Sequence, residues 1–352
     1  MVYQRGRFTV NMQRLKILKA ISLILCVCVL SGCSKNFVVT TKLGDKELFR
    51  IEDASASLSE MMLYLTTIQN QYEKVYGSEI WNQTASGETF EEQIKSMVLA
   101  KLAQVKVMNL MAESYKVTLS GDEETKLQTV SENFYNSLTD TEKEVLSLTQ
   151  DDIYSYYKEL LIASKLYEYV IRDVNPEISD DEARIVTVQE IFIKTYSLDA
   201  NGNHIEYSDR GKSEAYEKAE VVRAEALLGE VSFESLAGKY NEDDELTRTL
   251  SQGSDDNEVA ETAFNLSKDE ISDIIRTSDG YYILKCISDF DLEETLKNKE
   301  TILEKRKEEA FDEAYETYAD SLTKLFNEKL YKSITLIHNS DVTTDSFFDA
   351  DL

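Results

Sequence analysis

The only proline in this 352-residue chain, Pro176, separates two stretches of different sequence pattern. The residue before a proline is held out of the α region, so a helix is expected to end near Asn175. From residue 57 to 172, apolar residues recur at the three- and four-residue spacing of an α-helix. Residues 185–193 form a β-branched, apolar run that predicts a strand. The proline therefore predicts a domain boundary at about residues 176–184.

Residues 1–32 carry basic side chains and no acidic ones, and they contain the apolar run Ile21–Leu30. This run is too short to cross a bilayer, which needs about 20 residues. A basic segment before a short apolar run is typical of an export signal. Translation could start at Met1 or at Met12, because Met12 is also followed by basic residues.

The segment Leu30-Ser-Gly-Cys33 follows directly and resembles the lipobox of bacterial lipoproteins. The resemblance implies that Cys33 is lipidated and anchors the chain to the cell membrane on its extracytoplasmic face. The alternative is an ordinary signal peptide with an incidental cysteine. Loss of the signal leaves Cys33 and Cys286. With Cys33 acylated, no intramolecular disulfide is expected.

The charge of the chain excludes some classes of function. Its net charge is −28, and subtracting the +5 of residues 1–32 leaves −33 on the remainder. An acidic body argues against nucleic acid as a partner, because phosphate binding needs clustered Lys and Arg. With His204 and His338 as the only histidines, neither a His-rich metal site nor a Ser-His-Asp triad is expected. The acidic run 255–258 lacks the ligand spacing of a calcium loop, and no cofactor is indicated.

Three helix starts stand out in the region before the proline. Thr89, Ser120 and Thr149 are each followed by an acidic residue three positions later, as in a capping box. After the α/β stretch, apolar residues recur along 292–330 and form a single stripe. Such a stripe needs a partner, and the N-terminal helices are the expected one. The pattern leaves open whether two chains pair through this stripe as a homodimer.

The predicted fold class is α+β. A mostly helical region, made of N-terminal helices and a returning C-terminal helix, contains an inserted α/β domain. The expected segments are a signal peptide (1–32), a lipidated tether with a short hairpin near Gly44 (33–56), a helical region (57–178), the α/β domain (179–290), a C-terminal helix (291–336) and an acidic disordered tail (337–352).

Four ordered blocks of the α/β domain resemble the parvulin class of peptidyl-prolyl cis-trans isomerases. The blocks are Val186–Lys194, Ala224–Asp243, Thr262–Ser272 and Gly280–Lys285. The layout of the whole chain is similar to the PrsA and SurA type of exported foldase. In that type, a helical chaperone region accompanies the parvulin domain. The resemblance implies that the partners are unfolded or partly folded exported polypeptides.

The resemblance also assigns candidate site residues. Parvulins hold proline beside a small polar cluster: a histidine on the first strand, a cysteine or aspartate after the second helix, and a histidine on the last strand. The corresponding residues here are Glu190, Asp243 and Tyr282, so both histidines are replaced. The implied substrate pocket includes Val259, where the family has phenylalanine, and Phe264. Asp255 takes the place of the family's pocket methionine.

Each candidate also has a purely structural interpretation. Glu190 could be the outward residue of a half-exposed strand, and Tyr282 could fill the space of the missing histidine. Asp243 lies in an acidic run of the kind that forms solvated loops, and Phe264 is expected to pack in the core. The preferred function is a lipid-anchored foldase with a degenerate isomerase site. The alternatives are an active isomerase that uses Asp243 and Tyr282, and a non-enzymatic surface lipoprotein.

Overall fold

The computed structural model describes residues 37–40, 43–85, 87–200, 202–252 and 257–352. The predicted signal peptide, the lipidation site at Cys33 and the pocket position Asp255 lie outside these residues. The chain divides into two compact units. One, the helical unit, contains the described residues up to Val174 together with Glu308–Leu352; the other, the α/β unit, is Asn175–Lys307.

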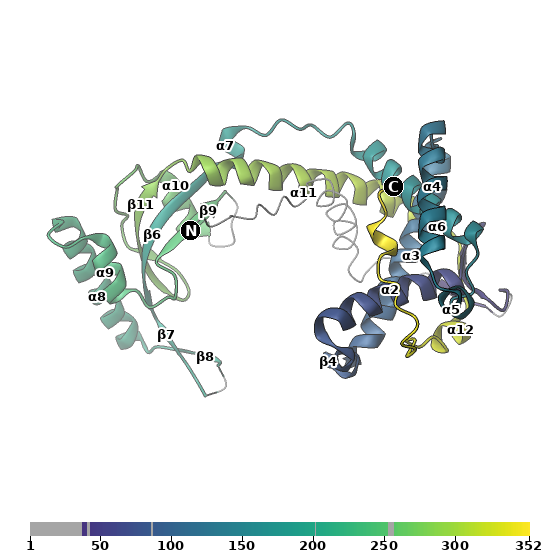
Figure 1. Ribbon diagram of the computed structural model, residues 1–352. Helices are drawn as coiled ribbons and strands as arrows, with labels where there is room; N and C mark the ends of the chain where they lie inside the picture. The colour runs from purple at the N-terminus through teal and green to yellow at the C-terminus, as the bar shows by residue number, and fades with distance from the viewer. Residues whose placement is uncertain (1–36, 41–42, 86, 201, 253–256) are drawn as a thin grey trace, which may run out of the picture. The chain divides into compact units, whose positions relative to one another are not determined.

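Helices make up most of the helical unit (Figure 1). They are α2 (Leu58–Tyr76), the 3₁₀ turn η1 (Ser78–Asn82), α3 (Phe90–Ser114), α4 (Gly121–Ser137), α5 (Asp140–Val145) and α6 (Gln150–Ile171). Thr89, Ser120 and Thr149 each begin a helix with a full capping box, which confirms the three predicted starts. Thr139 does the same for α5.

Helix α6 packs against both α3 and α4, and their apolar faces form the core of this unit. The last turns of α11 (Leu292–Ala319) also belong to this core, through buried Phe311 and Tyr315. The prediction that the C-terminal stripe packs on the N-terminal helices is therefore confirmed for this part of α11. The predicted helix over 291–336 is too long, because α11 ends at Ala319.

A four-stranded sheet in the helical unit was not predicted. Its strands are β1 (Phe37–Val39), β12 (Lys324–Phe326), β2 (Glu47–Ile51) and β3 (Ala54–Ser57), in that order across the sheet. Strands β1 and β12 pair in parallel, and the other neighbours are antiparallel. The expected tether over 33–56 is therefore wrong from residue 37 onward. The hairpin turns at residues 52–53 rather than at Gly44.

Two further elements depart from the sequence prediction. A small hairpin, β4 (Thr84–Ala85) with β5 (Glu88–Thr89), interrupts the helical region. The tail 337–352, which follows α12 (Glu328–Lys332), is not disordered: it contains the 3₁₀ turn η2 (Phe347–Asp349), and the Phe347 side chain is fully buried. The acidic composition misled the prediction, because a few apolar side chains and backbone hydrogen bonds hold this segment on the helices.

The α/β unit is built on an antiparallel sheet with helices on both faces. The strand order is β10 (Ile275–Arg276), β11 (Gly280–Ser288), β6 (Ile185–Lys194) and β9 (Thr247–Ser251). Helices α8 (Asp209–Leu228) and α9 (Phe233–Tyr240) cover one face, and α10 (Asn257–Asn265) packs on the other (Figure 1). The short helix α7 (Asp180–Ala183) precedes β6, and a hairpin of β7 (Tyr196–Leu198) and β8 (His204–Glu206) follows it. The predicted α+β class is confirmed.

Candidate functional site

Glu190 lies in the middle of β6, opposite Leu284 of β11. Side chains alternate along a strand, so Glu190 shares a face with Val188, which packs in the core under α10. The Glu190 side chain is 0% exposed, and its Oε2 lies 3.3 Å from a guanidinium nitrogen of Arg248. The structural interpretation of Glu190 as an outward residue on a half-exposed strand is therefore wrong.

Arg248 on β9 is the site residue that the sequence interpretation missed. It is opposite Val188 in the strand pairing, and its side chain is 23% exposed. Burial of a lone carboxylate is costly, so a cation close to Glu190 is what a stable fold requires. The signal was present in the sequence, since the alternation of Thr247-Arg-Thr-Leu250 places Arg248 and Leu250 on one face.

Tyr282 lies directly opposite Phe192 in the pairing of β11 with β6. The two rings stack with centroids 4.4 Å apart and planes 20° apart. Stacking of this kind adds to the stability that ring burial provides. The structure thus places Tyr282 next to the strand position of Glu190, in an aromatic pair on the same face of the sheet.

Asp243 lies in a loop, residues 241–246, that follows the edge of β6. The side chain of Asn241 accepts a hydrogen bond from the Phe192 amide at 2.6 Å, and the Glu190 amide donates to the Leu246 carbonyl at 3.0 Å. The Asp243 side chain is exposed, and its Oδ1 accepts a hydrogen bond from the Asp244 amide at 2.7 Å. The loop is therefore fixed beside the site while its aspartate faces solvent.

Val259 and Phe264 both belong to α10. Val259 is buried in the core between this helix and the sheet, and Phe264 is partly buried against the same core. The guanidinium of Arg184 lies 5.3 Å from the centre of the Phe264 ring and also donates to the Phe264 carbonyl. Both side chains have a packing role, as expected for Phe264.

The arrangement determines what chemistry these residues can perform. Isomerisation must overcome an amide rotation barrier of about 18–20 kcal/mol, which calls for a desolvated pocket with a few polar groups that reach the substrate. Here the two positions that hold histidine in parvulins contain a buried, ion-paired carboxylate and a stacked tyrosine. The remaining polar candidate, Asp243, is solvated. The Glu190–Arg248 pair links β6 to β9, and the stacked rings of Tyr282 and Phe192 link β11 to β6.

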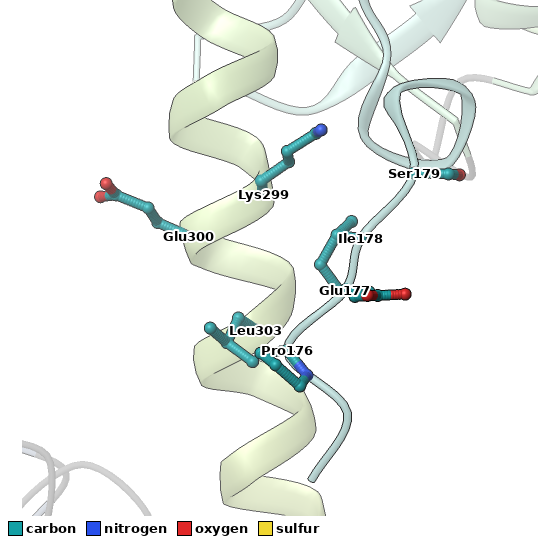
Figure 2. Close-up of a pocket in the computed structure, with 7 residues that line it drawn as sticks. All are labelled: Pro176, Glu177, Ile178, Ser179, Lys299, Glu300 and Leu303. Atoms are coloured by element: carbon teal, nitrogen blue, oxygen red, sulfur yellow. The ribbon is translucent and has the colours of Figure 1, made fainter.

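A separate cavity of about 590 Å³ lies within the α/β unit, between residues 176–179 and α11 (Figure 2). Pro176 and Leu303 face each other across it, and Lys299 points toward the extended segment. Lys299 forms an ion pair with Asp180 at 2.5 Å. None of the site residues assigned by resemblance lines this cavity.

Neither a membrane-spanning helix nor a metal-binding cluster occurs in the part of the chain that the structure describes. Among the described residues, no helix combines the length and the apolar character that crossing a membrane requires. In the same part of the chain, no group of three or more His, Cys, Asp or Glu side chains converges to hold a metal ion. Cys286, on β11, is a buried free thiol, and burial raises its pKa above the ordinary value.

Residues 191–288 match the Rotamase family, described as the PPIC-type PPIase domain. These residues therefore form a parvulin-class peptidyl-prolyl isomerase domain, which confirms the resemblance based on the four ordered blocks. The matched range includes Asp243, Tyr282, Val259 and Phe264 and begins one residue after Glu190.

Over 60–65% of its length, the chain is similar to PrsA-type foldases. It is 28% identical over 219 residues to the foldase protein PrsA of Caldanaerobacter subterraneus, a match covering 60% of this chain and 62% of the relative. It is 23% identical over 239 residues to PrsA of Streptococcus mutans, covering 65% and 66%. The matches thus span less than two thirds of these relatives. The crystal structure of a peptidylprolyl isomerase (PrsA) from Bacillus cereus aligns over 89% of this chain and 96% of its own, at 17% identity and a TM-score of 0.34.

Proposed function

We propose that this chain is a lipid-anchored extracytoplasmic foldase whose main activity is to bind unfolded exported polypeptides. The observation that carries the proposal is the state of the isomerase site. Within a parvulin-class domain, Glu190 is buried in an ion pair with Arg248, and Tyr282 is stacked on Phe192. A domain that keeps the fold but uses these positions for packing is suited to contact clients, with isomerisation weak or lost.

The charge of the chain supports this role. The chain after the signal, with a net charge of −33, would be repelled by an anionic envelope surface and would extend from it on its tether. Salt limits this repulsion to a distance of about 10 Å. The same negative field would attract basic exported chains before contact. The lipid on Cys33 would hold the protein where such chains emerge, as the lipobox resemblance implies.

The second candidate is an active prolyl isomerase, favoured by the match of residues 191–288 to the PPIC-type domain. In this candidate, Asp243 would supply the polar group and Tyr282 its hydrogen-bond partner. The solvated position of Asp243 and the stacked position of Tyr282 favour the first proposal instead.

The test uses the chain from residue 34 onward, which retains every described residue. Two activities are measured: cis-to-trans rates on a series of proline peptides, and suppression of the aggregation of a denatured client. The foldase proposal expects suppression of aggregation, with isomerisation near the uncatalysed rate and unchanged by Asp243→Ala. Appreciable isomerisation that Asp243→Ala abolishes would establish the second candidate. Failure of both activities would favour a non-enzymatic surface lipoprotein.

The anchoring part of the proposal has its own test. Cells expressing the full chain or Cys33→Ala are fractionated, and the protein is measured in the membrane and the medium or soluble fraction. Cys33→Ala is expected to leave the membrane fraction, because the acyl chains are lost with the cysteine thiol. Equal membrane retention of the two chains would contradict lipidation at this residue.

A further inference from the structure

The last part of the chain crosses the helical unit as an extended strap, Asn339–Leu352. It forms no strand, and its regular structure is limited to η2. It nevertheless buries Val342 and Phe347. Because the strap makes neither strand nor helix pairing with the unit, its attachment resembles that of a bound peptide more than that of a secondary-structure element.

Phe347 occupies an aromatic pocket formed by three helices. Its ring stacks on Tyr157 of α6 with centroids 4.6 Å apart and planes 7° apart. Tyr64 of α2 and Phe134 of α4 close the sides, each with its ring centroid 5.3 Å from that of Phe347. Phe348 meets Tyr64 edge-on at 4.9 Å. The pocket is therefore shaped to receive a flat ring.

Polar side chains of the helices also bind the backbone of the strap. Asn70 Nδ2 donates to the carbonyls of Val342 and Thr344, and Gln71 Nε2 donates to the Asp345 carbonyl at 2.6 Å.

The same kind of contact comes from two other helices. Glu142 Oε1 on α5 accepts hydrogen bonds from the amides of Thr343 and Thr344, each at 2.8 Å. Tyr157 Oη on α6 donates to the Phe347 carbonyl at 3.0 Å. Every peptide presents these carbonyl and amide groups, so the contacts would hold an extended segment of almost any sequence.

Charge helps to orient the strap. The strap carries four aspartates, and two of them form ion pairs with the helical unit: Asp345 with Lys74 at 3.1 Å, and Asp351 with Lys126 at 3.4 Å. Both pairs are largely exposed, so they orient the strap more than they stabilise it. The groove thus favours an extended segment with an aromatic residue, and the exposed ion pairs set the register of the strap with little effect on affinity.

We propose that this groove is a client-binding site in which the strap acts as an internal ligand. The groove is defined by Tyr64, Asn70, Phe134, Glu142 and Tyr157. The inference rests on the proposed function, because it identifies where unfolded polypeptides bind. A strap tethered to its groove competes at a roughly millimolar effective concentration. An extended client segment with an aromatic residue therefore gains access only when the strap leaves, and it then takes the same backbone hydrogen bonds and the same ring pocket.

The test measures binding of a labelled 12-residue peptide, one Phe flanked by Asp in a Ser/Thr sequence, by fluorescence anisotropy. The proteins are the chain from residue 34, its Phe347→Ala variant and the control Asp341→Asn, which alters an exposed strap residue that takes part in neither ion pair. Phe347→Ala is expected to bind the probe at least tenfold more tightly than the other two chains. A synthetic peptide of residues 339–352 should displace the probe, and the same peptide with Phe347→Ala should not.

Three results would overturn the proposal. These are a folded Phe347→Ala chain with no gain in probe affinity, equal displacement by the two synthetic peptides, and dimers in which the strap of one copy fills the groove of another.

Hydrogen exchange on the unmutated chain gives a second readout that does not depend on the variant folding. Saturating client should increase exchange at the Thr343 and Thr344 amides and leave α2 and α6 protected; unchanged exchange counts against the proposal. If the chain suppresses aggregation while these tests fail, the groove is wrong and the foldase function stands. If no client binds any variant, the function itself is wrong.

Discussion

The Glu190 carboxylate lies 3.3 Å from the Arg248 guanidinium, on the buried face of the parvulin-class sheet. The pair joins β6 to β9 at the strand position where the family resemblance places a histidine. A histidine there could exchange a proton or a hydrogen bond with a substrate. A carboxylate held by a neighbouring cation contributes to the stability of the sheet.

Arg248→Met should lower the free energy of unfolding by roughly 3 kcal/mol, because it leaves a buried carboxylate without its cation. Urea denaturation followed by circular dichroism measures the change. Arg210→Met is the matched control: Arg210 forms an ion pair with Glu214 on the surface of α8, where both side chains are exposed. That substitution should cost at most about 0.5 kcal/mol. Equal losses for the two variants would mean that the buried pair has no special role.

Gly280 allows β11 to begin close to β6. A Cβ atom at this position would lie 2.2 Å from the Ile193 carbonyl oxygen and 2.7 Å from the Phe192 ring. Gly280→Ala must therefore push the strands apart, and we expect a loss of about 3 kcal/mol in the free energy of unfolding. Gly238→Ala, in α9, is the control, since a Cβ there meets nothing within 4 Å. The control should stabilise the chain by about 0.5–1 kcal/mol in the same urea experiment. An unchanged Gly280→Ala protein would contradict the steric argument.

Lys106 of α3 lies inside the helical unit between two carboxylates. Its Nζ is 2.9 Å from Glu60 and 2.5 Å from Glu159. Lys106→Met leaves those acids facing each other without a cation, so it should lower the free energy of unfolding by about 3–5 kcal/mol. Lys95→Met, on the same helix, is the comparison. Lys95 donates a hydrogen bond to the backbone carbonyl of Ile334, so its loss leaves no buried carboxylate without a cation. Thermal denaturation that ranks Lys95→Met as the more damaging change would contradict the buried-cluster interpretation.

Glu60 should make the stability of this cluster depend on pH. Burial raises the pKa of Glu60, Lys106 lowers it and Glu159 raises it, and the net result is a pKa raised from 4.5 to about 8. The folded chain thus keeps a proton that the unfolded chain releases, so stability falls as pH rises from 4.5 to about 8 and is level above that range. Glu60→Gln removes this titration. Unfolding free energies measured across this range should favour the variant increasingly as pH rises; parallel curves would show that Glu60 does not titrate there.

Local sequence signals predicted the elements that depend on local chemistry. The capping boxes at Thr89, Ser120 and Thr149 located three helix starts, since a cap and its partner are three residues apart. The β-branched, apolar run of residues 185–193 predicts strand β6. The parvulin blocks gave the domain because they occur in order along the chain.

Pairings between distant parts of the chain could not be predicted in this way. Strands β1 and β12 have three residues each and are far apart in sequence, so neither run is long enough to indicate a strand by itself. The burial of Glu190 depends on Arg248, which only the pairing of β9 with β6 brings close to it. Phe347 is packed in a pocket of rings from three helices, while the acidic residues around it suggested disorder.

Glu142 should make the strap sensitive to acid. Burial pushes the pKa of Glu142 upward, but hydrogen bonds from the amides of Thr139, Thr343 and Thr344 outweigh it, and the pKa is lowered from 4.5. The unfolded chain therefore takes up a proton first, so this stabilisation is present above about pH 4.5 and is lost as pH falls through the folded value. Protection factors of the Thr343 and Thr344 amides, corrected for intrinsic exchange, should drop at least tenfold between about pH 7 and about pH 3. Glu142→Gln should show the low protection already at neutral pH, because an amide cannot accept at both of its ends. Glu144→Gln, an exposed change on the same helix, should behave like the unmutated chain. Equal protection of the unmutated chain at both pH values would show that the Glu142 carboxylate does not hold the strap.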